Sequence, residues 1–281
     1  RFLNEQLYPF SLHYKKLFDD NKIDPRKIRT AADLKHLPFT SKADFVDTPQ
    51  AGEKFREFIL QPDADKIKKA WPPLKLLQLS TEKAFKGAGY VKERISREYR
   101  PSFMTFTTGT TNKPIAYLYS RYDVDNLYLF GERMLTLFDV THPQKLVNMF
   151  PFAPHLAFWQ VAFGGVAGCV LVLSTGGGKV MGTEGNIAIL QKMQPAVILG
   201  VPSYVYYVLR TASEKGIKLS SIKKVVLGAG RVDESFKARL RYELEQMGCS
   251  GVSVFGTYGF TEARCAWAEC PTDIDVLSGY H

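Results

Sequence analysis

Short apolar segments alternate with longer amphipathic segments over the second half of the chain, and this pattern limits the fold more than any other feature of the sequence. The intervals between the apolar segments carry apolar residues at helical spacing. The apolar segments recur about every 27 residues, at 145–150, 169–173, 196–199, 223–227 and 252–255. Regular alternation of this kind predicts an α/β fold in which helices cover both faces of a parallel-rich sheet.

The first hundred residues do not follow this pattern. Residues 1–100 predict a mainly helical N-terminal segment packed on the main domain, with Thr30 as the N-cap of a short helix. Residues 101–281 are expected to form the α/β core. This core would begin with a hairpin whose strands lie at 103–106 and 115–119.

The formal net charge of the chain is +9 over 281 residues. A charge of this size favours an anionic partner, such as nucleic acid, a membrane surface or a polyanionic small molecule. The sequence shows no zinc-finger spacing, no aromatic–basic RNA signature and no unbroken basic helix face, so nucleic acid is disfavoured. Nucleotides and coenzyme A are polyanions that fit the charge equally well.

The four cysteines are too few for a disulfide scaffold, and no signal peptide precedes them, so a cytoplasmic location is expected. No apolar run approaches the roughly 20 residues that span a bilayer, so no membrane partner is expected. Cys249, Cys265, Cys270 and His281 have the side-chain types that bind Zn²⁺. Their spacings match no standard zinc finger, and unpaired thiols are the favoured interpretation.

The loops that follow predicted strands are candidate binding sites, because ligands of parallel sheets bind outside the carboxyl ends of the strands. The first such loop, from Thr107 to Lys113, contains four threonine hydroxyls, Gly109 and one lysine. Hydroxyls and backbone N–H groups donate to phosphate oxygens, Gly109 allows close approach of the backbone, and Lys113 adds a positive charge. The alternative is a polar surface hairpin without a ligand.

A second candidate loop is expected after the last strand, at 256–262. Its Tyr258 can stack on a purine, Thr261 can donate to a phosphate, and Glu262 is best explained beside phosphates by a bound divalent cation. The alternative is a tyrosine in the core and a glutamate in solvent. The glycines of 228–230 suit close approach to a flat ligand or to a neighbouring helix. Residues 174–179 resemble a phosphate nest, but a flexible turn is expected there.

Two of these segments resemble motifs of the adenylate-forming superfamily, which contains the acyl- and aryl-CoA synthetases. Thr107–Pro114 is similar to its phosphate loop, and Tyr258–Glu262 is similar to its Tyr-Gly-x-Thr-Glu motif. The order and separation of the two segments are also those of the family. Within the superfamily the chain is most similar to the phenylacetate-CoA ligases, because residues 33–44, 201–203, 268–270 and 279–281 have counterparts there.

The resemblance implies a two-step ligase. ATP and a small-molecule carboxylate would give an acyl-adenylate and pyrophosphate, and coenzyme A would then take the aryl or acyl group. One alternative is transfer to a carrier protein or another acceptor, and a second is a nucleotide-binding domain without catalysis. Relatives are often dimers, so a homodimer is one option, and the sequence leaves the oligomeric state open.

The resemblance further implies roles for single residues at the phosphates. Thr261 would contact the α-phosphate of ATP, and Glu262 would bind Mg²⁺. Together with Lys113, these two residues would form the catalytic set. The β- and γ-phosphates would be bound by the residues of the first loop: Thr107, Thr108, Gly109, Thr110, Thr111 and Lys113.

The implied adenine and substrate sites use other loops. Gly228, Ala229 and Gly230 would lie beside the adenine, and Tyr258 and Gly259 would flank the base. The pocket for the substrate carboxylate would be bordered by four residues: Phe152, His155, Tyr258 and Gly259.

The sequence also departs from the family pattern. Asn112 replaces the usual glycine before the lysine, and it tolerates positive φ better than most residues. Arg231 and Val232 replace an acidic residue and a proline in the adenine loop, which leaves the acceptor open. The ribose-binding aspartate, the hinge and the mobile C-terminal domain of the family would lie beyond His281. The chain alone is therefore expected to bind nucleotide weakly, with little turnover.

Overall fold

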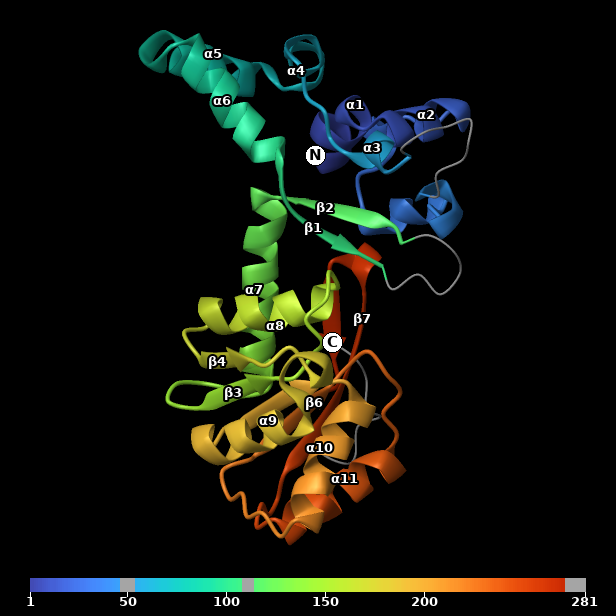
Figure 1. The fold of residues 1–281 in the computed structure, drawn as a ribbon. Helices are drawn as coiled ribbons and strands as arrows, with labels where there is room; N and C mark the ends of the chain where they lie inside the picture. Colours follow the sequence, from blue (N-terminus) through green and yellow to red (C-terminus); the bar gives the residue numbers. More distant parts are fainter. Residues whose placement is uncertain (46–53, 108–113, 271–281) are drawn as a thin grey trace. The chain divides into compact units, whose positions relative to one another are not determined.

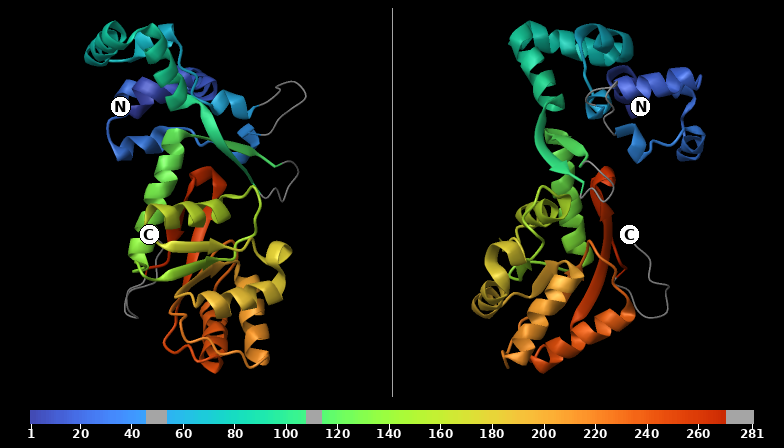
Figure 2. Two further views of the ribbon diagram at one scale, coloured as in Figure 1. Left: turned by 60° about the vertical axis from the view of Figure 1, so that its left-hand side comes forward. Right: turned by 45° about the vertical axis from the view of Figure 1, so that its right-hand side comes forward.

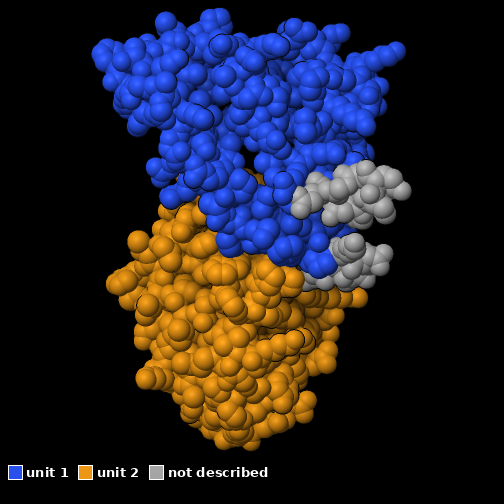
Figure 3. All heavy atoms as spheres, turned by 45° about the horizontal axis from the view of Figure 1, so that its top comes forward, with its two compact units in different colours: residues 1–122 blue, residues 123–281 orange. Residues whose placement is uncertain are grey.

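The computed structural model describes residues 1–45, 54–107 and 114–270. The chain divides into two compact units, Arg1–Tyr122 and Asp123–His281 (Figure 3). The predicted hairpin lies in the first of them. No helix within the described ranges combines the length and the apolar character needed to cross a membrane.

The first unit is mainly helical, as predicted. Its small core contains Phe10, Ile67 and Trp71. The predicted helix start at Thr30 is confirmed, since the backbone N–H of Thr30 donates to the Asp33 carboxylate at 2.8 Å. The helices are η1 (Leu3–Leu7), α1 (Tyr8–Phe10), α2 (Leu12–Asp20), η2 (Pro25–Lys27), η3 (Ala31–His36), η4 (Lys42–Phe45), α3 (Phe55–Phe58), α4 (Ala64–Ala70), α5 (Pro73–Lys86) and α6 (Ala88–Tyr99).

The predicted hairpin is confirmed as strands β1 (Pro101–Phe106) and β2 (Ala116–Ser120), which pair antiparallel. Among the described residues these strands form a two-stranded sheet of their own. The strand that precedes the first candidate loop is therefore not a member of the six-stranded sheet. The reason is local pairing, because a short hairpin loop lets β1 pair with its sequence neighbour.

The second unit is built on a six-stranded sheet with the strand order β4-β3-β5-β6-β7-β8 (Figure 1). The first five strands run parallel, and β8 is antiparallel to β7. The strands are β3 (Lys145–Asn148), β4 (Leu171–Ser174), β5 (Val197–Gly200), β6 (Lys224–Leu227), β7 (Ser253–Phe260) and β8 (Cys265–Ala268). The helices are α7 (Arg121–Leu137), α8 (Leu156–Ala167), α9 (Gly178–Met193), α10 (Pro202–Glu214) and α11 (Glu234–Gln246).

Both faces of this sheet are covered by helices, which confirms the predicted α/β class (Figure 2). Alternate strand residues face opposite sides. Val147 and Ile198 belong to the core beneath α9, α10 and α11, whereas their neighbours Leu146 and Val197 belong to the core beneath α7 and α8. Burial on both faces explains why the central strands β3, β5 and β6 are almost wholly apolar, whereas the edge strand β4 exposes Leu171.

The last strand differs from the prediction. The sequence predicts that this strand ends at Phe255 and that a loop begins at 256, but β7 continues to Phe260. Its residues 257–260 pair with β8, a strand that the sequence did not predict. When the sequence alone is considered, Gly256 and Gly259 indicate a loop, since glycine weakens a strand interior. Here the cross-strand pairing of Tyr258 with Trp267 extends the strand instead.

Helices α7 and α8 cross at a pair of glycines. A Cβ on Gly131 would lie 2.2 Å from the Cα of Gly164, which is backbone and cannot turn aside. We expect Gly131→Ala to lower the free energy of unfolding by about 1–3 kcal/mol, measured by urea denaturation. Gly185→Ala in α9 is the control, because its nearest neighbours would lie 3.5 Å away. Equal stability of the two variants would contradict the close crossing.

Candidate functional site

The strand order locates the edge of the sheet at which a ligand is expected. Strands β4 and β5 lie on opposite sides of β3, so the chain reverses its direction across the sheet between β3 and β5. Parallel sheets bind ligands at such switch points, outside the carboxyl ends of the strands. The loops that follow β3, β5 and β6 therefore meet at this edge.

The loop after β3 contains the predicted substrate residues Phe152 and His155. The buried Asn148 amide holds its start, donating to the Phe158 carbonyl at 3.1 Å and to Ser174 Oγ at 3.0 Å. Phe152 is 60% exposed, and its ring lies 5.2 Å from that of Phe158. His155 is the N-cap residue of α8. Both residues lie at the expected edge, and their contact with a substrate stays a prediction.

The glycine-rich turn after β4 is packed against the loop after β3. Gly176 and Gly177 have φ values of +72° and +71°, which few other residues adopt. The N–H of Phe152 donates to the Gly176 carbonyl at 3.2 Å, and a Cβ on Gly177 would lie 3.2 Å from the Met149 carbonyl oxygen. This packing differs from the flexible turn expected for 174–179.

The predicted adenine loop after β6 is also shaped by close packing. A Cβ on Gly228 would lie 2.5 Å from Thr257 Oγ1, and one on Gly230 would lie 3.1 Å from Pro202 of α10. Ala229 between them has a φ of +59°. The neighbouring strand and helix thus account for both glycines. Contact of this loop with an adenine stays a prediction.

The β7–β8 hairpin extends beyond the carboxyl edge and carries the second motif. The last pair of β7 with β6 is Gly256 with Leu227, and residues 257–260 pair with β8 alone. Four residues of strand span about 13 Å. The long red strand in Figure 2 shows this extension. The turn Thr261–Ala263 follows at its tip.

One face of this hairpin is aromatic. Tyr258 is 58% exposed, and its ring lies 5.9 Å from Phe260 and 6.0 Å from Trp267. The alternative of a tyrosine in the core is therefore wrong. A flat exposed ring backed by other rings suits stacking on a base. Gly259 lies in the same strand, with Ala266 of β8 opposite it.

Glu262 lies in the turn at the tip and is exposed to solvent. No ion-pair partner for its carboxylate is found within the described part of the chain. Thr261 beside it is partly buried. A carboxylate next to a hydroxyl fits the oxygen donors that Mg²⁺ prefers.

The base of the hairpin is held by an ionic cluster around the buried Lys237, which the sequence did not predict. Glu269 accepts from the Gly256 N–H at 2.7 Å and from Lys237 Nζ at 2.6 Å. Lys237 also donates to Glu234 at 2.7 Å. Burial lowers the pKa of Lys237, but its hydrogen bonds to the two carboxylates outweigh this and raise the pKa above its usual value.

The first predicted phosphate loop is described only at its start. Thr107 is buried, and its Oγ1 accepts from the N–H of Ile115 at 3.1 Å, which closes the β1–β2 hairpin. The rest of the loop lies outside the described residues, so its convergence with Glu262 stays a prediction. The predicted residues in question are Thr108, Gly109, Thr110, Thr111 and Lys113.

The cysteines do not form a metal site in the part of the chain that the structure describes. Cys249 lies in the core and its thiol donates to the Leu219 carbonyl. Burial raises the pKa of the Cys249 and Cys265 thiols, which disfavours the thiolate that metals bind. His281 lies outside the described residues.

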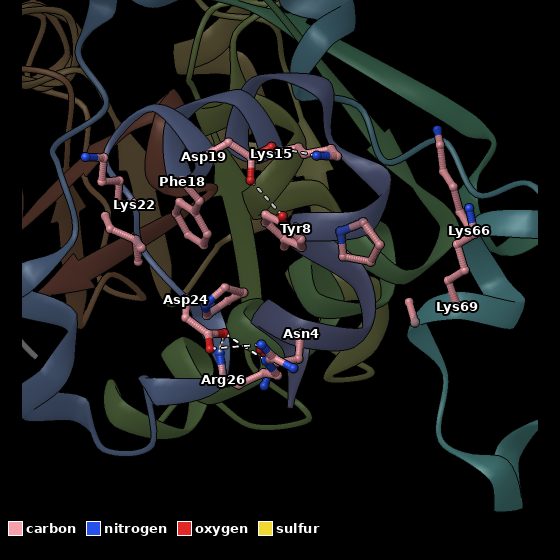
Figure 4. Close-up of a pocket in the computed structure, with 14 residues that line it drawn as sticks. Asn4, Tyr8, Lys15, Phe18, Asp19, Lys22, Asp24, Arg26, Lys66 and Lys69 are labelled. Atoms are coloured by element: carbon pink, nitrogen blue, oxygen red, sulfur yellow. Dashed lines mark hydrogen bonds and ion pairs between the residues drawn. The ribbon is translucent and has the colours of Figure 1, made fainter.

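The first unit contains a pocket of about 780 Å³ that includes none of the predicted site residues (Figure 4). Its two carboxylates are already paired. Asp19 accepts from Tyr8 at 2.7 Å and from Lys15 at 2.6 Å, and Asp24 accepts from Arg26 at 2.9 Å. Further lysines line the pocket, so its excess charge is positive.

Comparison with known proteins gives a family match. A family model described as "AMP-binding enzyme" matches residues 30–278. The chain is 24% identical over 259 residues to a phenylacetate-coenzyme A ligase of Aromatoleum evansii, covering 89% of this chain and 46% of that protein. It is 26% identical over 172 residues to a 3-methylmercaptopropionyl-CoA ligase of Ruegeria pomeroyi, covering 60% of this chain and 31% of that protein. The chain thus spans less than half the length of these curated relatives.

A solved structure shares the fold. An open conformation of 2-hydroxyisobutyryl-CoA ligase, in complex with 2-HIB-AMP and CoA, superposes with a TM-score of 0.66 at 15% identity. The match covers 91% of this chain and 50% of that protein. At this identity the likeness concerns the fold alone.

Proposed function

Because the chain belongs to the AMP-binding enzyme family, we propose that it carries the nucleotide-binding part of an ATP-dependent acid–thiol ligase. The enzyme would activate an aryl or acyl carboxylic acid to its adenylate and transfer the acyl group to coenzyme A. The observation that carries the proposal is the hairpin tip, where Thr261 and Glu262, which has no ion-pair partner among the described residues, follow the exposed Tyr258. Tyrosine, hydroxyl and carboxylate are the groups that a magnesium-bound nucleotide requires.

In the first step, an oxygen of the substrate carboxylate attacks the α-phosphorus of ATP and the bond to pyrophosphate breaks. Such an in-line displacement needs positioning and charge neutralisation more than covalent help from the protein. Tyr258 stacks on the adenine, beside Gly228–Gly230. Thr261 donates to the α-phosphate, and Lys113 neutralises charge on the outer phosphates, with the hydroxyls of Thr107–Thr111 as donors. Glu262 would hold Mg²⁺, and the bound cation would supply positive charge that screens the phosphates.

In the second step, the thiol of coenzyme A attacks the acyl carbon, and AMP leaves with the electron pair of the broken bond. Phe152 and His155 would border the carboxylic acid, because they follow β3 at the switch point of the sheet. The similarity to a phenylacetate-coenzyme A ligase supports an aryl acid as the substrate class. Because the chain spans less than half of that relative, the whole activity is proposed for a protein of the relatives' length.

Two measurements test this function. We expect the 281-residue chain to bind ATP in the presence of Mg²⁺, measured by calorimetry, with little turnover. The protein of the relatives' length should exchange labelled pyrophosphate into ATP in the presence of a carboxylate from a panel of aryl and aliphatic acids. Absence of exchange with every acid would contradict the ligase. Exchange without acyl transfer to free coenzyme A would instead favour a carrier protein as the acceptor.

A further inference from the structure

The turn at the tip of the β7–β8 hairpin has an arginine in an unusual backbone conformation. The last cross-strand pair is Phe260 with Cys265, so the turn consists of residues 261–264. Arg264 has a φ of +56°, and its N–H donates to the Thr261 carbonyl at 3.1 Å. Glycine or asparagine is favoured at such a position, because a Cβ disfavours the left-handed region. The turn alone does not require an arginine.

The Arg264 side chain accounts for this choice of residue. Its Nη1 donates to Asp123 Oδ1 at 2.6 Å, across 141 positions of sequence. Asp123 lies in the first turn of α7. The Arg264 side chain is 37% exposed and the Asp123 side chain is 25% exposed. A short charge-assisted hydrogen bond between partly buried groups is stronger than an exposed ion pair. The tip of the hairpin is therefore tethered to the start of a core helix.

This tether lies where the hairpin has least support from the sheet. Residues 257–260 pair with β8 alone, and the Glu269 cluster holds only the base of the hairpin, at Gly256. The turn that carries Thr261 and Glu262 is thus separated from the base by four strand residues. The Arg264–Asp123 ion pair is a direct contact between this turn and α7.

We propose that Arg264 is a positioning residue, whose ion pair with Asp123 holds Thr261 and Glu262 in place for a magnesium-bound nucleotide. The inference rests on the proposed function of the hairpin tip. A residue that orients a metal-binding group contributes to affinity without touching the ligand, and its loss costs about tenfold or more in binding. Arg264 acts through the backbone of the turn, which its own N–H closes onto Thr261.

The test uses Arg264→Gly, because glycine suits the positive φ and removes the side chain that forms the ion pair. Asp123→Asn removes the same ion pair from the other side. We expect each variant to weaken ATP binding in the presence of Mg²⁺ by about tenfold, and the double variant to be no weaker than either single one. Amide hydrogen exchange at 261–263 should become about tenfold faster in the nucleotide-free protein. Arg264→Lys should restore part of the nucleotide affinity and part of the protection from hydrogen exchange. Asp20→Asn in the first unit is the charge-matched control and should change neither quantity.

The nucleotide affinity and the hydrogen exchange rate together separate the role of Arg264 from the proposed function on which it rests. Unchanged hydrogen exchange in Arg264→Gly would overturn the tether. Faster exchange with unchanged nucleotide affinity would overturn the positioning role, since the pair would then be only structural. If the wild-type chain bound no ATP, the proposed function would fall, while hydrogen exchange would still decide whether the ion pair holds the turn.

Discussion

Glu262→Gln is expected to weaken the binding of ATP in the presence of Mg²⁺ by about 10- to 100-fold. The carboxylate at the hairpin tip has no ion-pair partner among the described residues, so its charge is available to a divalent cation. The neutral amide of glutamine is a weaker ligand for a hard cation. Loss of an interaction with a charged group costs about 1.5–3 kcal/mol, which corresponds to this range of affinities. Calorimetric titration with ATP, at several Mg²⁺ concentrations, measures the effect.

The same titration without Mg²⁺ gives the internal control. ATP alone should bind the variant as well as the wild type or better, because Glu262 then only repels the phosphates. Glu245→Gln in α11 removes one exposed carboxylate elsewhere in the second unit and should leave both affinities unchanged. An unaltered affinity for magnesium-bound ATP in Glu262→Gln would remove the assigned role of this residue.

Lys237→Met should lower the free energy of unfolding by about 3–5 kcal/mol. The Lys237 side chain is 6% exposed and donates to Glu269, whose carboxylate is itself largely buried. Removing one partner of a buried pair leaves an uncompensated charge, which is the main cost. Urea denaturation monitored by tryptophan fluorescence measures the change. Lys192→Met replaces an exposed lysine of α9 and should have little effect.

A double variant isolates the cause of this loss. In Lys237→Met/Glu269→Gln the uncompensated charge is gone, while glutamine still accepts from the Gly256 N–H. The double variant should therefore regain a large part of the lost stability. If it were less stable than Lys237→Met alone, the loss would come from packing around the lysine rather than from the buried charge.

The parallel sheet could be predicted because its central strands β3, β5 and β6 are buried on both faces. Segments such as 196–199 are short and wholly apolar, and the helices between them have clear apolar faces. The alternation of strands and helices can therefore be recognised in the sequence without knowledge of the packing. The strand β8 could not be predicted in this way. Its pairing depends on the partner strand β7, whose glycines favour a loop when they are considered alone.

The candidate site was predicted only where its residues are close in sequence. Tyr258, Thr261 and Glu262 lie within five positions and form a recognisable motif. The groups that support this motif come from distant positions. Arg264 meets Asp123 across 141 residues, and Lys237 meets Glu269 across 32. No local spacing predicts such pairs, because they arise only when the sheet and its helices are packed.

The length of the β7–β8 hairpin has a consequence for how such a site can change in evolution. Each residue added to a strand moves the tip outward by about 3.3 Å and also reverses the side to which later side chains point. Lengthening both strands by one residue would therefore turn the tyrosine ring to the opposite face. Lengthening both by two would keep the ring on its face and carry the carboxylate about 7 Å further out. Insertions before the tyrosine thus keep its ring on the same face only in even steps, and the length of the strand sets how far the carboxylate lies from the edge of the sheet.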